Sequence, residues 1–256
     1  MNNLIKNLVF NIYTFFSTSF ENFLFKKQVV NNQLLQYGYM KYNFVNNLLL
    51  KQFIEKKIKG SNNYICKYEI KKNKIAELIY LIFIKNNLSK HISNLTGFNY
   101  CIDFFVAYET KHIPETEKQN QIYANHWHRD KPFSKNTLKL IIPIEEIGEK
   151  NGGIEILDKE STLFFKKNIQ NLENKNIQFY KMLAKNNEYL LFLPNLCFHR
   201  AGTPEDNLTR SQIMFQLNPS KNWCYKKNLY DLQFFLEPKF PLFKLLNKTI
   251  SIENEK

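Results

Sequence analysis

Two histidines, an arginine and an aspartate lie within the six residues NHWHRD at 125–130, in a chain of 256 residues with five histidines. On a β-strand, His128 and Asp130 would point to the same side, because side chains alternate along a strand. A neutral imidazole and a carboxylate at this spacing can fill two adjacent positions around a metal ion. One more histidine would complete a two-histidine, one-carboxylate face, which leaves positions open and suits non-haem Fe(II) in an oxygenase.

A third ligand is available further along the chain, at His199 in the stretch LFLPNLCFHRAG. Arg210 opens the apolar run that follows, and antiparallel neighbours joined by a short connection would bring it into the same cavity. Arginine is rare here, since only Arg129, Arg200 and Arg210 are found among 36 basic residues. An arginine in such a chain indicates a need for the planar fork that binds a carboxylate through two hydrogen bonds. Arg129 and Arg200 are interpreted as surface charges or as neighbours of the ligands.

The elements that must position these residues are predicted to be short strands rich in β-branched and aromatic side chains. Polar turns separate them, a pattern typical of an antiparallel sandwich or barrel. Asn151, Gly152 and Gly153 between two apolar runs predict a tight hairpin turn. The predicted strands cover residues 100–108, 121–128, 137–144, 152–157, 188–194 and 210–217.

The first 95 residues are predicted to be mostly helical, with one early strand. One helix is expected over 43–60, ending at Gly60, and another over 74–92, with Ile75, Leu78, Ile79 and Ile82 on one face. Gly97 closes this region. We expect one integrated domain, with a helical region at 1–95, a catalytic core at 96–235 that includes a polar insertion at 158–186, and a tail at 236–256.

The net charge of +13 comes mainly from lysines spread along the chain. This distribution does not predict the localised basic surface of a nucleic-acid-binding protein. Four cysteines without CxxC spacing favour free thiols in a reducing compartment, and thus a cytoplasmic location. Residues 1–27 are too polar for a spanning helix and lack a cleavage site. They predict an amphipathic helix on the domain, with contact to a membrane surface as the less favoured alternative.

Four stretches carry a resemblance to a known family. WHRD (127–130), NGGIEIL (151–157), HRAGTPEDNLTR (199–210) and, more weakly, YGYMKYNFV (37–45) resemble the phytanoyl-CoA dioxygenase family of Fe(II)- and 2-oxoglutarate-dependent oxygenases. The resemblance implies a mainly β fold, a double-stranded β-helix (jelly roll, cupin-like) with helices outside.

The same resemblance implies the site. His128, Asp130 and His199 would hold Fe(II), and Arg210 would bind the distal carboxylate of 2-oxoglutarate. With dioxygen, the enzyme would hydroxylate or desaturate a small-molecule or carrier-tethered substrate and release succinate and carbon dioxide. Related halogenases lack the carboxylate ligand, so Asp130 favours oxygen transfer or desaturation. The substrate and the oligomeric state are not predicted.

The chain departs from the family pattern at two places. DKES (158–161) replaces a Pro-Gly-Ser-His turn, and Gln212 replaces a serine that often helps hold the co-substrate. His126 has three open interpretations: an alternative ligand in a cupin-like HxH pair, a residue that supports the ligands or faces the substrate, or a structural histidine.

Several alternatives remain open from the residues. His91 and His112 are expected to be solvated. Tyr108 and Lys139 could reach the co-substrate, although core packing and surface exposure are favoured for them. A jelly-roll binding module without turnover and a membrane-surface protein are the alternative functions.

Overall fold

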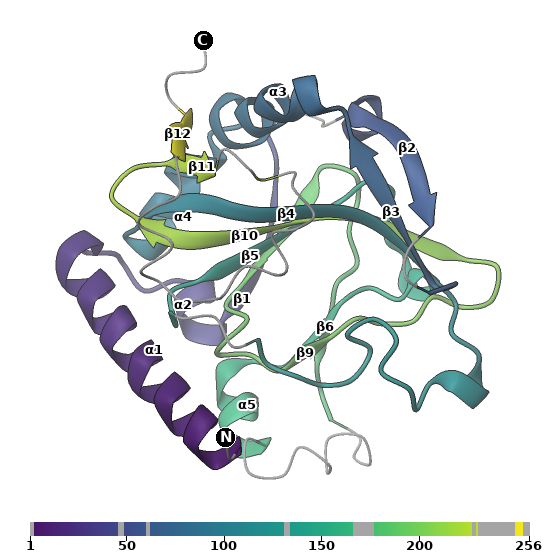
Figure 1. Cartoon of the computed structure of the whole chain (residues 1–256), viewed down its shortest axis with the longest axis horizontal. Helices are drawn as coiled ribbons and strands as arrows, with labels where there is room; N and C mark the ends of the chain where they lie inside the picture. Colours follow the sequence, from purple (N-terminus) through teal and green to yellow (C-terminus); the bar gives the residue numbers. More distant parts are fainter. Residues whose placement is uncertain are drawn as a thin grey trace.

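A computed structural model gives the arrangement of the chain (Figure 1). It describes residues 3–45, 49–59, 62–130, 134–165, 177–226, 229 and 249–252. Its helices are α1 (Asn3–Phe25), α2 (Gln33–Tyr37), α3 (Ile75–Ile79), α4 (Leu88–Thr96) and α5 (Lys159–Phe165). Its strands are β1 (Tyr39–Asn43), β2 (Ile54–Lys59), β3 (Ile65–Ile70), β4 (Asn99–Lys111), β5 (Leu138–Pro143), β6 (Glu155–Ile156), β7 (Tyr180–Lys181), β8 (Glu188–Phe192), β9 (His199–Arg200), β10 (Thr209–Ser220), β11 (Cys224–Lys226) and β12 (Thr249–Ser251).

Nine of the described strands form a larger sheet with the order β1-β8-β5-β10-β4-β11-β12, and β3 pairs with both β4 and β2. A smaller sheet has the order β7-β6-β9. Figure 1 shows β6 and β9 below β5 and β10. The architecture is a double-stranded β-helix, which confirms the predicted fold class.

Strand β10 explains how this fold separates a core from a site. Ile213, Phe215 and Leu217 belong to the main hydrophobic core, together with residues of α3 and α4. The alternate side chains of Arg210, Gln212, Met214 and Gln216 turn to the opposite face of the sheet, toward the smaller sheet. Met214 packs there against the cluster of Ile141, Leu190 and Ile156, which joins the two sheets. One strand therefore supplies both the outer core and the polar interior of the barrel.

Helices cover the outer face of the larger sheet, as Figure 1 shows for α3 and α4. The predicted helical face at 75–82 is confirmed, since Ile75, Leu78, Ile79 and Ile82 are all buried. The helix continues from α3 as a π-helical segment, η3 (Tyr80–Lys85). Gly97 ends α4 with a left-handed φ of 78°, as expected of a glycine C-cap.

The predicted helix at 43–60 is wrong. This stretch contains the short 3-10 helix η1 (Leu50–Phe53) and the strand β2, while Gly60 lies outside the described residues. Strand β2 pairs along its length with β3, which joins β4. Cross-strand pairing supplies partners that a single-sequence helical period does not reveal.

Two further predictions need correction. Residues 121–127 form a loop, because Asn125 satisfies nearby backbone groups: its Oδ1 accepts from Ile122 N and its Nδ2 donates to Lys118 O. Ala124 also adopts a positive φ of 49°. The turn at Asn151–Gly153 is tight, with Gly152 at a φ of 64°, but β5 and β6 around it belong to different sheets and form no hairpin.

The polar insertion at 158–186 contributes α5 and β7, and its residues 166–176 lie outside the described part. Most of the predicted tail at 236–256 also lies outside it. Within the described ranges, no helix is both long enough and apolar enough to cross a bilayer. All four cysteines are free thiols.

Candidate metal centre

The three predicted ligands come together from two distant parts of the chain. His128 and Asp130 lie on the loop before β5, and His199 lies on β9. One ligand atom from each residue can be chosen so that all lie within 4.8 Å of one another. The backbone fixes this meeting, because His128 N donates to His199 O (3.1 Å) and His199 N donates to His128 O (2.9 Å). A third backbone hydrogen bond, from Asp130 N to Pro194 O at 3.0 Å, holds Asp130 beside the two histidines.

Both histidines are oriented by their backbones for binding through Nε2. His128 Nδ1 lies 2.8 Å from His126 O, and His199 Nδ1 lies 3.0 Å from Cys197 O. A carbonyl oxygen only accepts hydrogen bonds, so each Nδ1 must carry the proton. In the neutral ring, Nε2 then keeps its lone pair for a metal. The Nε2 atom of His199 is buried and has no hydrogen-bond partner within the described residues.

Asp130 faces both imidazoles through one oxygen. Its Oδ1 lies 3.6 Å from His128 Nε2 and 3.6 Å from His199 Nε2. Its other oxygen, Oδ2, accepts a hydrogen bond from the Lys139 ammonium group. Burial opposes ionisation of Asp130, but the adjacent His199 ring and the Lys139 charge hold its pKa far below the ordinary value. Burial and the neighbouring His199 lower the pKa of His128, which favours its neutral form.

Arg210 is the largest fully buried side chain among the described residues, with 1% of its surface exposed. Its Nη1 donates to the carbonyl oxygens of Gly152 and Gly202 (3.2 Å to Gly202). Its Nε and Nη2 have no hydrogen-bond partner in the described part of the chain. These two atoms form one edge of the guanidinium fork, which matches a carboxylate. Burial lowers the pKa of Arg210 and is the main cause of the shift.

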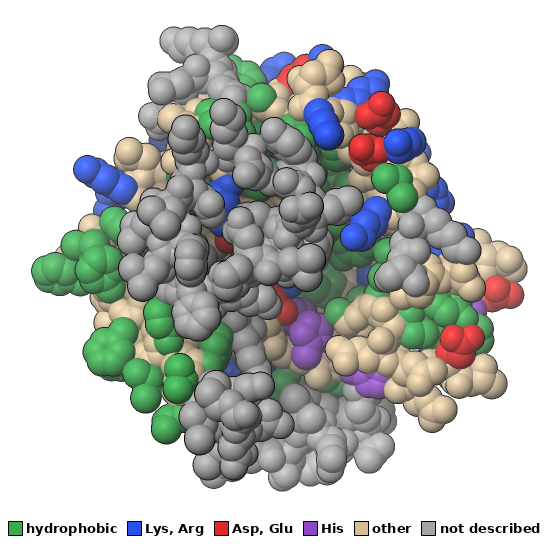
Figure 2. Space-filling model, in the orientation of Figure 1, with side chains coloured by type: hydrophobic (Ala, Val, Ile, Leu, Met, Phe, Trp, Pro, Cys, Tyr) green, Lys and Arg blue, Asp and Glu red, His purple; other side chains and the backbone are tan. Residues whose placement is uncertain are grey.

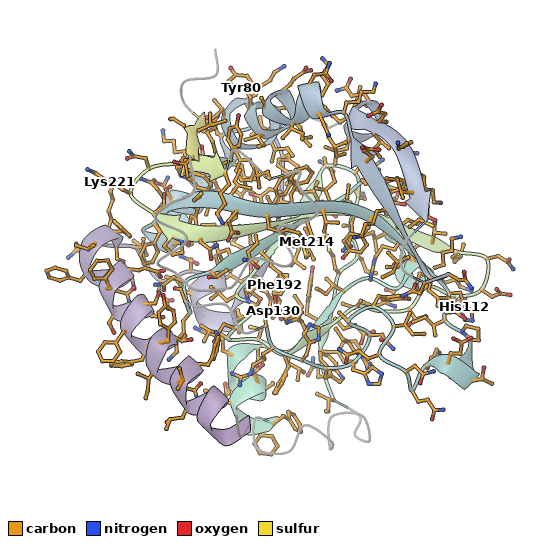
Figure 3. The ribbon with its side chains drawn as sticks, in the orientation of Figure 1. Tyr80, His112, Asp130, Phe192, Met214 and Lys221 are labelled. Carbon is orange, nitrogen blue, oxygen red and sulfur yellow. The ribbon has the colours of Figure 1, made fainter. Side chains whose placement is uncertain are left out.

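Gln212 lies two residues beyond Arg210 on the same face of β10. Its Nε2 donates to the hydroxyl oxygen of Tyr108, which is its register partner on β4. Its Oε1 is buried and finds no partner among the described atoms. Lys139 on β5 is the register partner of Gln216 on β10 and of Phe192 on β8. Figure 3 shows Asp130, Phe192 and Met214 close together between the sheets, which places the site inside the barrel.

The other predicted histidines and arginines lie outside the cluster. His126 supplies only its backbone carbonyl to His128, and its own Nε2 is buried without a described partner. Arg129 donates to Asn195 O (3.3 Å) and lies over the Phe198 ring. Arg200 pairs with Glu155 (2.6 Å) and lies over the Trp127 ring. Both arginines therefore support the strands around the ligands.

The expectation that His91 and His112 are solvated is wrong. Both are partly buried, with the His91 ring 4.2 Å from that of Tyr42 and His112 Nδ1 2.9 Å from Pro204 O.

Lys139 reaches the site, contrary to the surface exposure or core packing favoured for it from the sequence. The structure places its side chain in the barrel, 13% exposed and bonded to a ligand carboxylate. The alternation of strand 137–144 puts Lys139 on the same face as Ile141, which was the available signal. Of the two glycines whose carbonyls anchor Arg210, Gly152 was predicted as a turn residue, and no role was predicted for Gly202.

Comparison with known proteins supports the fold. No family model matches the chain, and no curated protein matches its sequence. Solved structures do match. The non-haem α-ketoglutarate-dependent epimerase SnoN from nogalamycin biosynthesis, in complex with Fe3+, α-ketoglutarate and nogalamycin RO, has a TM-score of 0.53 at 10% identity and covers 73% of this chain and 81% of its own.

Two further structures are similar. The non-haem α-ketoglutarate-dependent carbocyclase SnoK has a TM-score of 0.51 at 13% identity, covering 85% of this chain and 94% of its own. HygX from Streptomyces hygroscopicus, with nickel and 2-oxoglutarate bound, has a TM-score of 0.51 at 7% identity, covering 76% and 89%. The chain thus shares its fold with these three proteins.

Proposed function

We propose that the protein is an Fe(II)- and 2-oxoglutarate-dependent dioxygenase. The observation that carries the proposal is the cluster of His128, Asp130 and His199, in which a buried Nε2 faces a carboxylate and has no described hydrogen-bond partner. An unsatisfied buried polar atom is costly and points to a missing partner. Two imidazoles and one carboxylate form the donor set of non-haem Fe(II) oxygenases with open positions.

The co-substrate site rests on Arg210. A buried cation with one edge anchored on two glycine carbonyls presents its other edge, Nε and Nη2, for a carboxylate. 2-Oxoglutarate carries a carboxylate at its far end, and Arg210 would bind it through two parallel hydrogen bonds. The similar enzymes with bound α-ketoglutarate or 2-oxoglutarate support the same co-substrate.

When bound, Fe(II) would couple oxidative decarboxylation of 2-oxoglutarate by dioxygen, giving succinate and carbon dioxide, to hydroxylation or desaturation of a substrate carbon. The chain's own residues would hold and orient the reactants. Asp130 would supply the anionic ligand through Oδ1. Lys139 would hold the other oxygen, Oδ2, in an ion pair. Apolar side chains such as Phe192 and Met214 would keep water from the reacting carbon.

The finer assignment is to the phytanoyl-CoA dioxygenase type, on the motifs at 127–130, 151–157 and 199–210. A small-molecule or carrier-tethered substrate is part of this proposal. We also propose a cytoplasmic location, which the four free thiols support.

An anaerobic titration tests the proposal. Metal-free protein receives Fe(II) with and without 2-oxoglutarate, and the visible charge-transfer absorption is recorded. We expect a band that requires both additions, is lost in Asp130→Ala and is weakened in Arg210→Ala. His126→Ala is the matched control, because it removes a neighbouring imidazole and leaves the backbone carbonyl that orients His128; its band should remain.

Turnover then separates an enzyme from a binding module. Conversion of 2-oxoglutarate to succinate should need Fe(II) and dioxygen and should stop in Asp130→Ala. Well-folded protein that takes up neither iron nor 2-oxoglutarate would contradict the proposal. Binding of both without any succinate would favour the jelly-roll binding module.

A further inference from the structure

Helix α1 turns most of its apolar surface away from the rest of the protein. Eight of its apolar side chains are between 48% and 85% exposed: Leu8, Val9, Ile12, Phe15, Phe16, Phe20, Phe23 and Leu24. Their spacing places them on one side of the helix, since residues three, four, seven and eight apart share a face. We call this stripe the α1 apolar face. In Figure 2, apolar side chains gather along the side of the molecule where Figure 1 draws α1.

The opposite side of α1 is attached by polar contacts and by Phe25, which packs against the main hydrophobic core. Thr18 Oγ1 accepts a hydrogen bond from Lys135 N at 3.0 Å. Glu21 accepts hydrogen bonds from Ser134 Oγ and from Asn136 Nδ2 (3.2 Å). A helix that served only to cover the sheet would turn its phenylalanines inward. Here the packed side leaves four phenylalanines, Phe15, Phe16, Phe20 and Phe23, exposed, so the apolar face is a built feature of the fold.

The size of the face indicates an interaction surface. Phe15, Phe16, Phe20 and Phe23 are each more than 60% exposed. A phenylalanine side chain can bury roughly 150–250 Å². Four of them in one stripe therefore exceed the few hundred Å² beyond which an exposed apolar patch marks a binding surface for protein or membrane.

Charge favours a lipid surface over a second copy of the chain. Glu21 is the sole acidic residue of α1, and it is bonded on the packed side. Lys26 and Lys27 are exposed directly after the helix. The chain carries a net charge of +13, which repels another copy and attracts anionic headgroups.

We propose that the α1 apolar face docks the protein on an anionic bilayer, with α1 lying in the plane of the interface. Its phenylalanines enter the boundary between headgroups and acyl chains, and Lys26 and Lys27 meet the headgroup phosphates. This docking does not depend on iron or 2-oxoglutarate.

Vesicle flotation of the full chain tests the proposal. We expect binding to vesicles of phosphatidylcholine with phosphatidylglycerol, weaker binding to phosphatidylcholine alone, and weakening by salt. The double variant Phe16→Ser/Phe20→Ser should lose binding at least tenfold. Ile58→Ser/Tyr80→Ser is the matched control, because it removes exposed apolar side chains from β2 and η3, away from α1 in Figure 1, and its binding should be unchanged.

A fluorescent residue gives a second measurement. Trp127 and Trp223 are buried, so Phe20→Trp adds an exposed indole at one place on the face. Its emission should shift to the blue when anionic vesicles are added. Failure of the folded wild-type chain to bind them would overturn the proposal, as would full binding by Phe16→Ser/Phe20→Ser. Dimers in sedimentation velocity that the same variant dissociates, without vesicle binding, would assign the face to a second copy and also overturn it.

Discussion

Lys139 and Asp130 form an ion pair inside the barrel, with the lysine Nζ against Asp130 Oδ2 and Asp130 Oδ1 turned to both histidines. The carboxylate thus binds the Lys139 ammonium group through one oxygen and faces the two histidines with the other. A buried carboxylate with a neighbouring cation stays ionised, which a metal ligand requires.

We expect Lys139→Met to bind Mn(II) more tightly than the wild-type protein. The ammonium group repels a nearby divalent cation and competes for the same carboxylate, and removing it should gain roughly tenfold, or about 1.4 kcal/mol. Calorimetric titration of metal-free protein measures the change. Lys41→Met, which removes an exposed lysine paired with Glu188, is the control. Weaker binding by Lys139→Met would mean that Lys139 mainly orients Asp130.

We expect metal binding at His128, Asp130 and His199 to stabilise the folded protein. Mn(II) at 100 times its dissociation constant should raise the free energy of unfolding by about 2.7 kcal/mol, because metal binds the folded state. Urea unfolding with and without Mn(II) measures it. Asp130→Ala should show no gain and His126→Ala the full gain; an equal gain in all three proteins would place the ion elsewhere.

Arg210→Lys should weaken 2-oxoglutarate binding by roughly tenfold or more. A lysine keeps the charge but loses the planar fork, and with it one of two parallel hydrogen bonds. Calorimetry under anaerobic conditions with Mn(II) gives the dissociation constant. Arg200→Lys is matched in chemistry but lies with Glu155 and Trp127, so its affinity should be unchanged. Equal affinity in Arg210→Lys would refute the assigned role.

Gly202→Ala should destabilise the protein by roughly 1–3 kcal/mol. A Cβ at this position would collide with the backbone of Gly152 and Gly153, beside the carbonyls that anchor Arg210. Urea unfolding gives the free energy, and 2-oxoglutarate affinity should fall with it. At Gly148 a Cβ would meet only the Asn151 side chain, so Gly148→Ala should have a much smaller effect.

Cys224 should be the most reactive cysteine. A hydrogen bond from the Cys101 thiol lowers the pKa of Cys224 to about 7, whereas burial raises the pKa of Cys197 to about 12. Alkylation proceeds through the thiolate, so the rate at Cys224 should rise with pH and level off above about 7. Mass spectrometry of iodoacetamide-treated peptides measures it. In Cys101→Ala the lost donor should raise that pKa and slow the reaction at neutral pH several-fold; an unchanged profile would count against the hydrogen bond.

The sequence allowed the β-rich class and the ligand cluster to be predicted because both depend on local signals. Polar and apolar side chains alternate visibly along RSQIMFQL, which predicts strand β10. The rarity of histidine and arginine draws attention to His128, His199 and Arg210. The prediction that His128 and Asp130 share a side assumed a β-strand. Residues 121–127 in fact form a loop, and His128 makes only an isolated bridge with His199.

What could not be predicted depends on contacts between distant segments. Strand β2 exists because β3 pairs with it, and the weak helical period of 43–60 gives no sign of that partner. Alternation puts Lys139 on the inner face of β5, but its ion pair with Asp130 depends on the backbone hydrogen bond that holds Asp130 N to Pro194 O. The outward face of α1 follows from hydrogen bonds between Glu21 and residues 134 and 136, more than a hundred positions away.

The backbone carbonyls of His126 and Cys197 accept the hydrogen bonds from Nδ1 of His128 and His199, and this arrangement affects metal exchange. Each ring has its tautomer and direction set by its own backbone two residues earlier, before any ion arrives. Loading therefore requires neither a ring flip nor a proton transfer within the rings. We expect iron to leave and return without refolding, so that protein inactivated by chelation or iron loss can be restored by simple addition of fresh Fe(II).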